Sequence, residues 1–323
     1  MTTTAKPTTA RPDAGAKDGP EGPESPPKPS SGAGRGRRSG PAHLERSPLL
    51  GRAIVNLVLG VFVIYTLAPV LWLFFAATSD ADALSSARVF SLEDPVLWQN
   101  LRELFATDGG IYGRWYLNTI LYAVVGGILS ALISTACGYA FEKYRFRHRE
   151  KLFGLVLVAV MVPQTVLALP LYLIASQTGA VNTFWSVFIP LLFNPFGVYL
   201  ARIFAEGYVP DEVLDAARVD GAGELKMFFS VALKMLAPGV MTVFLFQLTA
   251  IWNNFFLPMV MLSDQKLYPV ALGLYNWNSM ATVSPEYQLV VIAGSLLGLL
   301  PLILAFMLLQ RFWKAGLTAG SVK

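Results

Sequence analysis

The side chains of this 323-residue chain that could do chemistry lie in two places. One is a polar stretch, residues 212–230, with carboxylates at Glu212 and Asp215 and a glycine at position 221. The other is a group of neutral polar side chains inside an apolar run: Gln247, Trp252, Asn253 and Asn254. Neither place holds a Ser-His-Asp, HExxH or paired-carboxylate arrangement, so the sequence predicts no catalytic residue and no enzyme activity.

The composition indicates which elements must position these groups. Only 14% of the residues are charged and 54% are hydrophobic, whereas soluble domains carry about 25% charged residues. The mean hydropathy is +0.51, which predicts an integral membrane protein whose first partner is the lipid bilayer. A lone Cys137 excludes an intrachain disulfide, and His43 and His148 lie in polar segments, so no metal site is predicted.

Long runs without any charged residue predict the membrane helices. They are residues 53–79, 115–141, 152–201, 235–263 and 287–310. One membrane helix needs about 20 residues. The third run is long enough for two, and its middle, residues 176–182, is typical of a turn. The sequence therefore predicts an all-α membrane protein with six transmembrane helices. A short interfacial helix is expected at 94–104, and prolines 163, 170, 190 and 195 are expected to bend helices around a cavity.

Basic residues alternate between the loops, which predicts the orientation of the chain. With the N-terminus inside, most Lys and Arg fall in inner segments, so both termini are expected to be cytoplasmic. The net charge of +4 then reports topology rather than a nucleic-acid partner. Residues 1–48, rich in Pro, Gly and Ser, are expected to be a disordered cytoplasmic tail. Residues 49–315 would form the transmembrane domain and residues 316–323 a second tail.

The apolar runs also indicate how such a protein could be energised. They hold no Asp, Glu, Lys, Arg or His, groups that ion-coupled carriers use within the membrane. The chain also has no G-x-x-x-x-G-K-[ST] loop, so it is not expected to hydrolyse nucleotide itself. Energy for uphill transport would have to enter through another polypeptide at the cytoplasmic face, where residues 212–230 lie.

Residues 208–229 predict a short helix, a tight turn and a second helix. Pro210 suits the first helical position, and Glu212 complements the helix dipole in the first turn. Gly221 suits the left-handed residue that ends a helix. A second helix is expected to begin near Glu224. The segment could be a coupling element or simply an amphipathic connector.

The stretch "DAARVDGA" (residues 215–222) resembles the EAA loop of the permease subunits of bacterial ABC importers. That pattern runs roughly E-A-A-x-x-D-G-A, so Asp215 replaces the usual Glu, and Lys234 replaces a later proline. The resemblance implies a coupling loop at about 203–234 that docks on an ATPase subunit. The positions it implies are Glu212, Asp215, Ala216, Ala217, Asp220 and Gly221.

Three further stretches are similar to the second permease of maltose-type systems: "MVPQTVLALPLY" (161–172), "IWNNFFLP" (251–258) and "GLTAGSVK" (316–323). The similarity covers about 54–323. It implies a multi-pass subunit in a bacterial cell membrane that forms half of a sugar path. The partners implied are a second permease, an ATPase dimer that binds the ATP and an extracellular solute-binding protein. No cofactor of its own is implied.

The polar side chains of the fourth run leave two interpretations open. Gln247, Trp252, Asn253 and Asn254 could line the substrate path or make hydrogen bonds between helices. The cargo could be a sugar, or a polyol or glycerol phosphate carried by the same architecture. An ion-coupled carrier or channel acting alone and a scaffold without transport are the alternatives from other classes.

Overall fold

The computed structural model describes residues 49–86, 90 and 95–319, and their regular secondary structure is helical throughout. The chain divides into two units, Met1–Leu57 and Val58–Lys323. Of the first unit only residues 49–57 are described, at the beginning of α1 (Leu49–Thr78). The predicted disordered tail, residues 1–48, lies outside the described residues.

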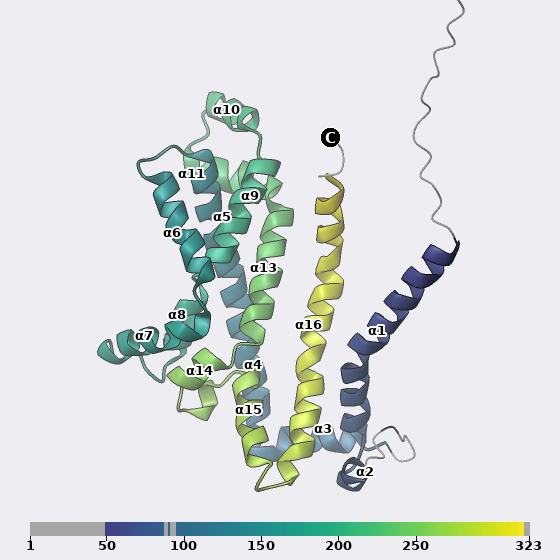
Figure 1. Ribbon diagram of the computed structural model, residues 1–323. Helices are drawn as coiled ribbons and strands as arrows, with labels where there is room; N and C mark the ends of the chain where they lie inside the picture. The colour runs from purple at the N-terminus through teal and green to yellow at the C-terminus, as the bar shows by residue number, and fades with distance from the viewer. Residues whose placement is uncertain (1–48, 87–89, 91–94, 320–323) are drawn as a thin grey trace, which may run out of the picture. The chain divides into compact units, whose positions relative to one another are not determined.

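Candidate membrane spans are the main elements of the described chain (Figure 1). Four stretches are long and apolar enough by themselves: Gly51–Thr78, Ile111–Lys143, Phe184–Tyr208 and Glu286–Gln310. Two helix pairs qualify only if each bent pair counts as one span, which raises the number to six. The prediction of an all-helical membrane protein is therefore confirmed, with four to six candidate spans.

The bounds of the remaining elements follow the chain. The second span consists of α4 (Ile111–Ile120), the π-helical turn η2 (Leu121–Val125) and α5 (Gly126–Lys143). Later come α15 (Val270–Met280) and the long α16 (Glu286–Ala319), which extends into the predicted C-terminal tail. Short elements connect these helices: α2 (Ala81–Ser85), η1 (Thr107–Gly109), η3 (Phe228–Ala232), α12 (Leu233–Met235) and η4 (Gln265–Leu267).

The short helix expected at 94–104 is present as α3 (Leu97–Ala106). Its apolar face lies against other parts of the protein, because Leu104 is fully buried in a cluster with Trp115, Trp277 and Val290. The amide of Asn100 donates to the carbonyls of Ala77 (2.9 Å) and Ser79 (3.0 Å) at the end of α1. α3 thus connects the end of the first span to α16.

Three helices are interrupted within the predicted runs. α6 (Arg149–Met161) and α7 (Gln164–Gln177) meet at 105° around Pro163. α8 (Phe184–Leu191) is followed after a short break by α9 (Pro195–Tyr208). α13 (Ala237–Trp252) is followed after another break by α14 (Phe256–Met261). The first two breaks have a proline at the start of the second helix, where its missing N–H costs little.

Two of the four prolines expected to bend helices mark these breaks, and two do not. Pro163 and Pro195 lie at the α6–α7 and α8–α9 breaks, whereas Pro170 and Pro190 lie inside α7 and α8. The predicted turn is confirmed between α7 and α8. A lost helical hydrogen bond within a helix can be tolerated without a change of direction when neighbouring groups accommodate it.

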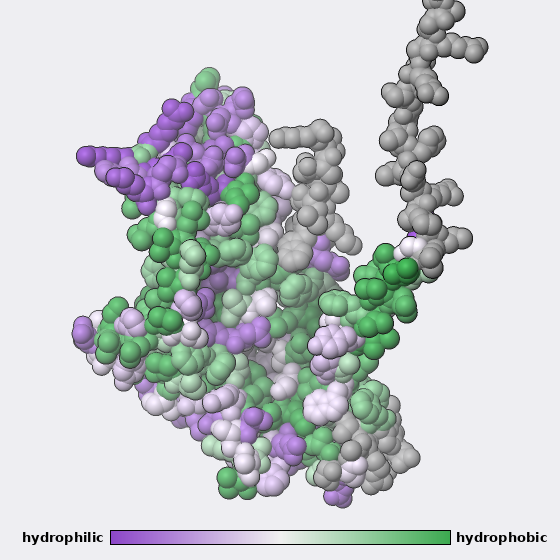
Figure 2. Space-filling view, viewed as in Figure 1, coloured by the Kyte–Doolittle hydropathy of each residue, from purple (hydrophilic) through white to green (hydrophobic). Residues whose placement is uncertain are grey.

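Helix α5 packs closely against α9. A Cβ atom added to Gly138 would lie only 2.6 Å from the Cβ of Ala201 and from the backbone nitrogen of Arg202. Only glycine permits this crossing, because real Cβ atoms do not approach backbone so closely. Figure 2 shows hydrophilic residues gathered over α10 and the adjacent ends of α5 and α6, with hydrophobic residues over the helices below. This distribution suits a membrane protein with a polar loop at one end.

Candidate functional site

The polar stretch forms the predicted helix, turn and helix. Pro210 was expected to be the first residue of the helix. In the structure it is the N-cap, with extended backbone, and α10 (Asp211–Val219) begins one residue later. Gly221 has φ +78° and ends the helix in the left-handed region, as predicted. The next helix, α11 (Glu224–Met227), begins at the expected residue. The sequence therefore predicted the local backbone to within one residue.

One apolar side chain holds α10 against the helices beneath it. Leu214 is 1% exposed and packs in a cluster that includes Tyr139 of α5, Val209 and Met227. Two apolar side chains of the loop face outward instead: Val219 is 88% exposed and Leu225 is 78% exposed. Large apolar side chains at the tip of a charged loop offer a contact surface that the described part of the chain leaves exposed.

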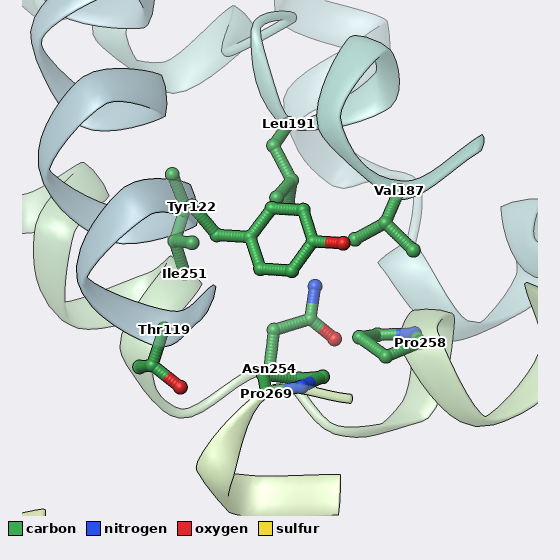
Figure 3. Close-up of a pocket in the computed structure, with 8 residues that line it drawn as sticks. All are labelled: Thr119, Tyr122, Val187, Leu191, Ile251, Asn254, Pro258 and Pro269. Carbon is green, nitrogen blue, oxygen red and sulfur yellow. The ribbon is translucent and has the colours of Figure 1, made fainter. Parts of the chain in front are cut away.

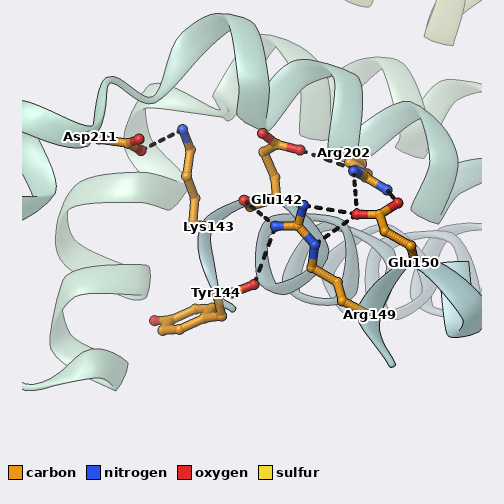
Figure 4. A network of polar contacts seen from close by, with 7 residues as sticks. All are labelled: Glu142, Lys143, Tyr144, Arg149, Glu150, Arg202 and Asp211. Carbon is orange, nitrogen blue, oxygen red and sulfur yellow. Dashed lines mark hydrogen bonds and ion pairs between the residues drawn. The ribbon is translucent and has the colours of Figure 1, made fainter. Parts of the chain in front are cut away.

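Two consecutive residues at the end of α5 hold the starts of both loop helices. The Lys143 ammonium lies 2.8 Å from a carboxylate oxygen of Asp211, which begins α10 (Figure 4). The Tyr144 hydroxyl donates to a carboxylate oxygen of Glu224, which begins α11. Motion of the loop must therefore move or break contacts with α5.

The electrostatics of this clamp favour the charged carboxylate. The hydrogen bond and charge of Lys143 lower the pKa of Asp211 below its ordinary value. Burial and the hydrogen bond to Glu224 raise the pKa of Tyr144, so its hydroxyl stays protonated and remains a donor. The clamp is therefore complete at neutral pH.

A second polar network lies beside the clamp and joins three helices. Arg202 of α9 pairs with Glu142 of α5 (3.1 Å) and with Glu150 of α6 (3.3 Å). Arg149 also pairs with Glu150 at 2.8 Å, as Figure 4 shows. The guanidinium of Arg202 lies 4.1 Å from the ring centre of Phe153, where a cation is attracted by the aromatic face. Ion pairs thus connect the ends of α5, α6 and α9 beneath the loop.

Most of the residues implied by the EAA-loop resemblance are exposed. They include Glu212, Ala216, Asp220 and Gly221. Asp215 is exposed as well, and its carboxylate accepts a hydrogen bond from Arg218 at 2.8 Å. Ala217 differs, because it is partly buried and packs against the cluster that holds Leu214.

The side chain of Gln247 replaces a backbone hydrogen bond that a proline cannot make. Its side chain is buried, and Nε2 donates to the carbonyl of Leu191 at 2.7 Å. In an uninterrupted helix that carbonyl would accept from the residue four positions later, which is Pro195 and has no N–H. Trp252 is buried too, and its indole N–H donates to the carbonyl of Gly298 in α16 at 3.0 Å. Both side chains make interhelical hydrogen bonds.

The two asparagines make hydrogen bonds to nearby backbone atoms at the end of α13 and the start of α14. Asn253 is exposed, and its amide donates to the carbonyl of Thr249 at 2.9 Å. Asn254 is partly buried, and its Oδ1 accepts from the backbone N–H of Leu257 at 3.3 Å, at the start of α14. Asn254 thus holds the first turn of α14 by a side-chain hydrogen bond, although it lies one residue before the N-cap, Phe255.

A cavity of about 450 Å³ lies where the three helix breaks meet. Of the predicted path residues, Gln247 and Asn254 line it, and Trp252 and Asn253 do not. Its polar lining also includes residues that sequence reasoning missed: Gln164, Thr165 and Asn194. Their signal in the sequence is an amide or hydroxyl next to a proline within an uncharged run, as in Pro163-Gln164 and Asn194-Pro195.

A second cavity of about 10 Å³ lies deeper (Figure 3). Its lining includes Thr119, Tyr122, Leu191 and Asn254, and Figure 3 shows the side-chain amide of Asn254 directed toward the Tyr122 ring. A space of that size holds at most about one water molecule. Asn254 therefore reaches from the larger cavity into the packed interior, and the small cavity has no room for a solute.

Comparison with known proteins places this geometry in a family. Residues 123–315 match the binding-protein-dependent transport system inner membrane component family, and the chain belongs to it. The family confirms the resemblance seen in the sequence: the chain is a transporter subunit of the inner membrane, without an ATPase site of its own.

Three relatives illustrate the similarity. Arabinooligosaccharides transport system permease protein AraQ of Halalkalibacterium halodurans is 34% identical over 67% of this chain and 76% of the relative. Maltodextrin transport system permease protein MdxG of Bacillus subtilis is 29% identical over 85% and 97%. sn-Glycerol-3-phosphate transport system permease protein UgpE of Yersinia pestis is 26% identical over 81% and 94%.

Proposed function

We propose that this chain is a permease subunit of an ATP-driven importer for a sugar or oligosaccharide. The observation that carries the cargo class is the chemistry of the 450 Å³ cavity. The residues that line it offer neutral amides, a hydroxyl and aromatic rings, and none of them is charged. Sugars present hydroxyl groups that both donate and accept, and they carry no charge that a binding site must neutralise.

The relatives support the same cargo class. The AraQ and MdxG proteins are named for arabinooligosaccharides and maltodextrin, whereas the more distant UgpE protein is named for sn-glycerol 3-phosphate. A phosphate group is usually bound by Lys, Arg or several backbone N–H groups. Because none of the described residues that line the large cavity is basic, a neutral cargo is favoured over glycerol phosphate.

The loop formed by α10 and α11 is proposed to couple this path to an ATPase. Its exposed face carries Ala216, Val219 and Leu225, which suit docking in a cleft of a partner. ATP would bind to that partner, an ATPase dimer. A second permease would complete the path, and an extracellular solute-binding protein would deliver the cargo.

Purification followed by reconstitution tests this proposal. The chain, purified in mild detergent, is expected to co-elute with an ATPase that carries a Walker A loop and with a second permease. In proteoliposomes that also hold the binding protein, labelled sugar should accumulate only with ATP. A chain that purified alone and moved solute without ATP would contradict the proposal.

The proposed orientation, with both termini and the α10–α11 loop cytoplasmic, has its own test. Val219 and Val283 are matched apolar residues, 88% and 86% exposed, on α10 and in the turn before α16. Each is replaced by Cys in a Cys137→Ser background, and intact cells are treated with an impermeant maleimide. Val283→Cys should react at once, and Val219→Cys only after permeabilisation. The reverse pattern would overturn the orientation.

A further inference from the structure

We propose that the cavity at the three helix breaks is a binding subsite of this chain itself for one neutral sugar ring. The inference rests on the proposed function, and it deepens it by assigning side chains beyond those implied by the resemblance. The residues assigned are Gln164, Thr165, Asn194, Gln247 and Asn254.

The helix breaks indicate a polar occupant. Helix α7 begins at Gln164, α9 at Pro195 and α14 at Phe256, and residues beside each break line this one cavity. Irregular backbone within a membrane is tolerated only where it is buried in protein or faces a water-filled space. Three breaks around one cavity therefore favour a hydrated space in which a polar solute can replace water.

Hydrogen bonds within the protein determine what the cavity offers. Asn194 uses its Oδ1 to accept from the N–H of Gly197 (2.9 Å), and Asn254 uses its Oδ1 at α14. Gln247 uses its NH₂ group on Leu191. Asn194 is thus left with amide donors and Gln247 with an amide acceptor, while the amide group of Asn254 points toward the Tyr122 ring. A hydroxyl group, which donates and accepts, matches this mixed set.

Aromatic rings complete the site. Phe193 is 74% exposed and Phe196 is 41% exposed, and both line the cavity together with Phe256. The C–H face of a sugar ring is apolar and packs on an aromatic face, while its hydroxyl groups point outward to the amides. The cavity of about 450 Å³ lies within the range of small-molecule sites.

Two other occupants are conceivable, a lipid acyl chain and a helix of the second permease. An acyl chain would remove water from Gln164 and Thr165 without returning a hydrogen bond, and both are exposed in this chain. A helix would close the cavity to water permanently. A sugar differs from both because it needs access from water, and access can be measured.

The first experiment measures access in the reconstituted complex, with Cys137 replaced by Ser. Thr165→Cys is treated with the water-soluble thiol reagent MTSET, alone and with maltotriose, arabinotriose, lactose or sn-glycerol 3-phosphate. Asn253→Cys is the control, because Asn253 is exposed near the cavity but does not line it. The sugar that the complex transports should slow modification of Thr165→Cys several-fold, and leave Asn253→Cys unaffected.

The outcomes separate the subsite from the function. If Thr165→Cys never reacts, the cavity is closed by lipid or a partner helix, and the subsite is wrong. It is also wrong if Thr165→Cys reacts but the transported sugar gives no protection, while the proposed function stands. If the wild-type complex transports none of the sugars with ATP, the proposed function fails and the sugar subsite with it.

A second pair of variants needs no reactive probe. Thr165→Val keeps the shape and removes one hydroxyl, so KM for the transported sugar should rise about 3- to 10-fold, as expected for one hydrogen bond. Thr249→Val is the matched control, because the Thr249 hydroxyl donates to the carbonyl of Leu245 within its own helix. Equal KM values for both variants and the wild type would contradict the subsite.

Discussion

The α10–α11 loop and the large cavity satisfy their polar groups in opposite ways. The loop uses full charges: Asp215 pairs with Arg218 at exposed positions, and the exposed Asp211 pairs with Lys143, whose side chain is only 8% exposed. The cavity uses neutral side chains on backbone atoms, as Gln247 does on Leu191. Exposed ion pairs contribute little to stability, typically about 0–1 kcal/mol, whereas a buried polar group without a partner costs about 1–3 kcal/mol. The Asp215–Arg218 pair can therefore rearrange at low cost, whereas the hydrogen bonds of the cavity wall cannot.

Helix α5 contacts both regions. Its end holds the loop through Lys143 and the adjacent Tyr144. Earlier in the same helix, Gly138 permits the close approach of α9. Ser134 donates to the carbonyl of Asn194 at the cavity (3.4 Å). A displacement of the loop would thus reach the α8–α9 break through one continuous helix. This contact path is the physical basis for testing the two regions against each other.

The largest effect is expected from Gly221→Val in the loop. At φ +78° a β-branched residue is strained, so the turn between α10 and α11 should change its direction. ATP-dependent uptake is expected to fall at least about 10-fold, which corresponds to a coupling free energy lower by about 1.4 kcal/mol. The protein should still insert in the membrane. Uptake and ATPase rates of the same proteoliposomes provide the measurement.

Gly223→Val is the matched control for that prediction. Gly223 lies two residues away, has extended backbone (φ −70°, ψ 161°), and has open space where a Cβ would be placed. Extended backbone suits valine, so uptake should stay close to wild type. If both variants were equally impaired, the loop would be sensitive to bulk rather than to its turn.

The next largest effect is expected in the cavity wall. Gln247→Leu keeps the volume but leaves the Leu191 carbonyl without its donor, because Pro195 cannot replace it. The expected loss is about 1–3 kcal/mol, seen as a lower thermal midpoint in detergent. Asn253→Leu is the control, since Asn253 is exposed and bonds only within its own helix. An unchanged midpoint for Gln247→Leu would show that the wall tolerates an unpaired carbonyl.

The sequence predicted the loop better than the cavity, for a physical reason. Local signals determine the loop: a proline, a dipole-matched acidic turn and a left-handed glycine lie within a dozen residues. The cavity depends on breaks from three distant segments, so no single stretch contains it. Gln247 and Trp252 lie five residues apart in α13, and Gln247 bonds to α8 whereas Trp252 bonds to α16. Which of the two helix faces meets the cavity depends on the tertiary arrangement.

A smaller effect is expected from breaking the clamp on α5. Lys143→Met and Tyr144→Phe each remove one contact to the loop, to Asp211 and to Glu224 respectively. Because the contacts hold the starts of the two loop helices, the double variant should raise the ATP consumed per sugar transported more than the two single variants together. Strictly additive effects would mean that the contacts act independently. The thermal midpoint should change little in any of the three variants.

The smallest expected effect is the pH dependence of the Lys143–Asp211 pair. Since Lys143 lowers the pKa of Asp211, folding favours the carboxylate. The contribution of the pair to stability is therefore present above the unfolded-state pKa and is lost as the pH falls through the lower folded-state pKa. Asp211→Asn should remove this part of the acid sensitivity, so wild type and variant should begin to converge below about pH 4 and meet only below the folded-state pKa. Lys143→Met should show the same reduced slope, because either change eliminates the pair. The measurement is the thermal midpoint of wild type and both variants between neutral and acidic pH. If wild type remained more stable than Asp211→Asn in acid, Asp211 would stabilise the loop by packing or capping rather than by charge.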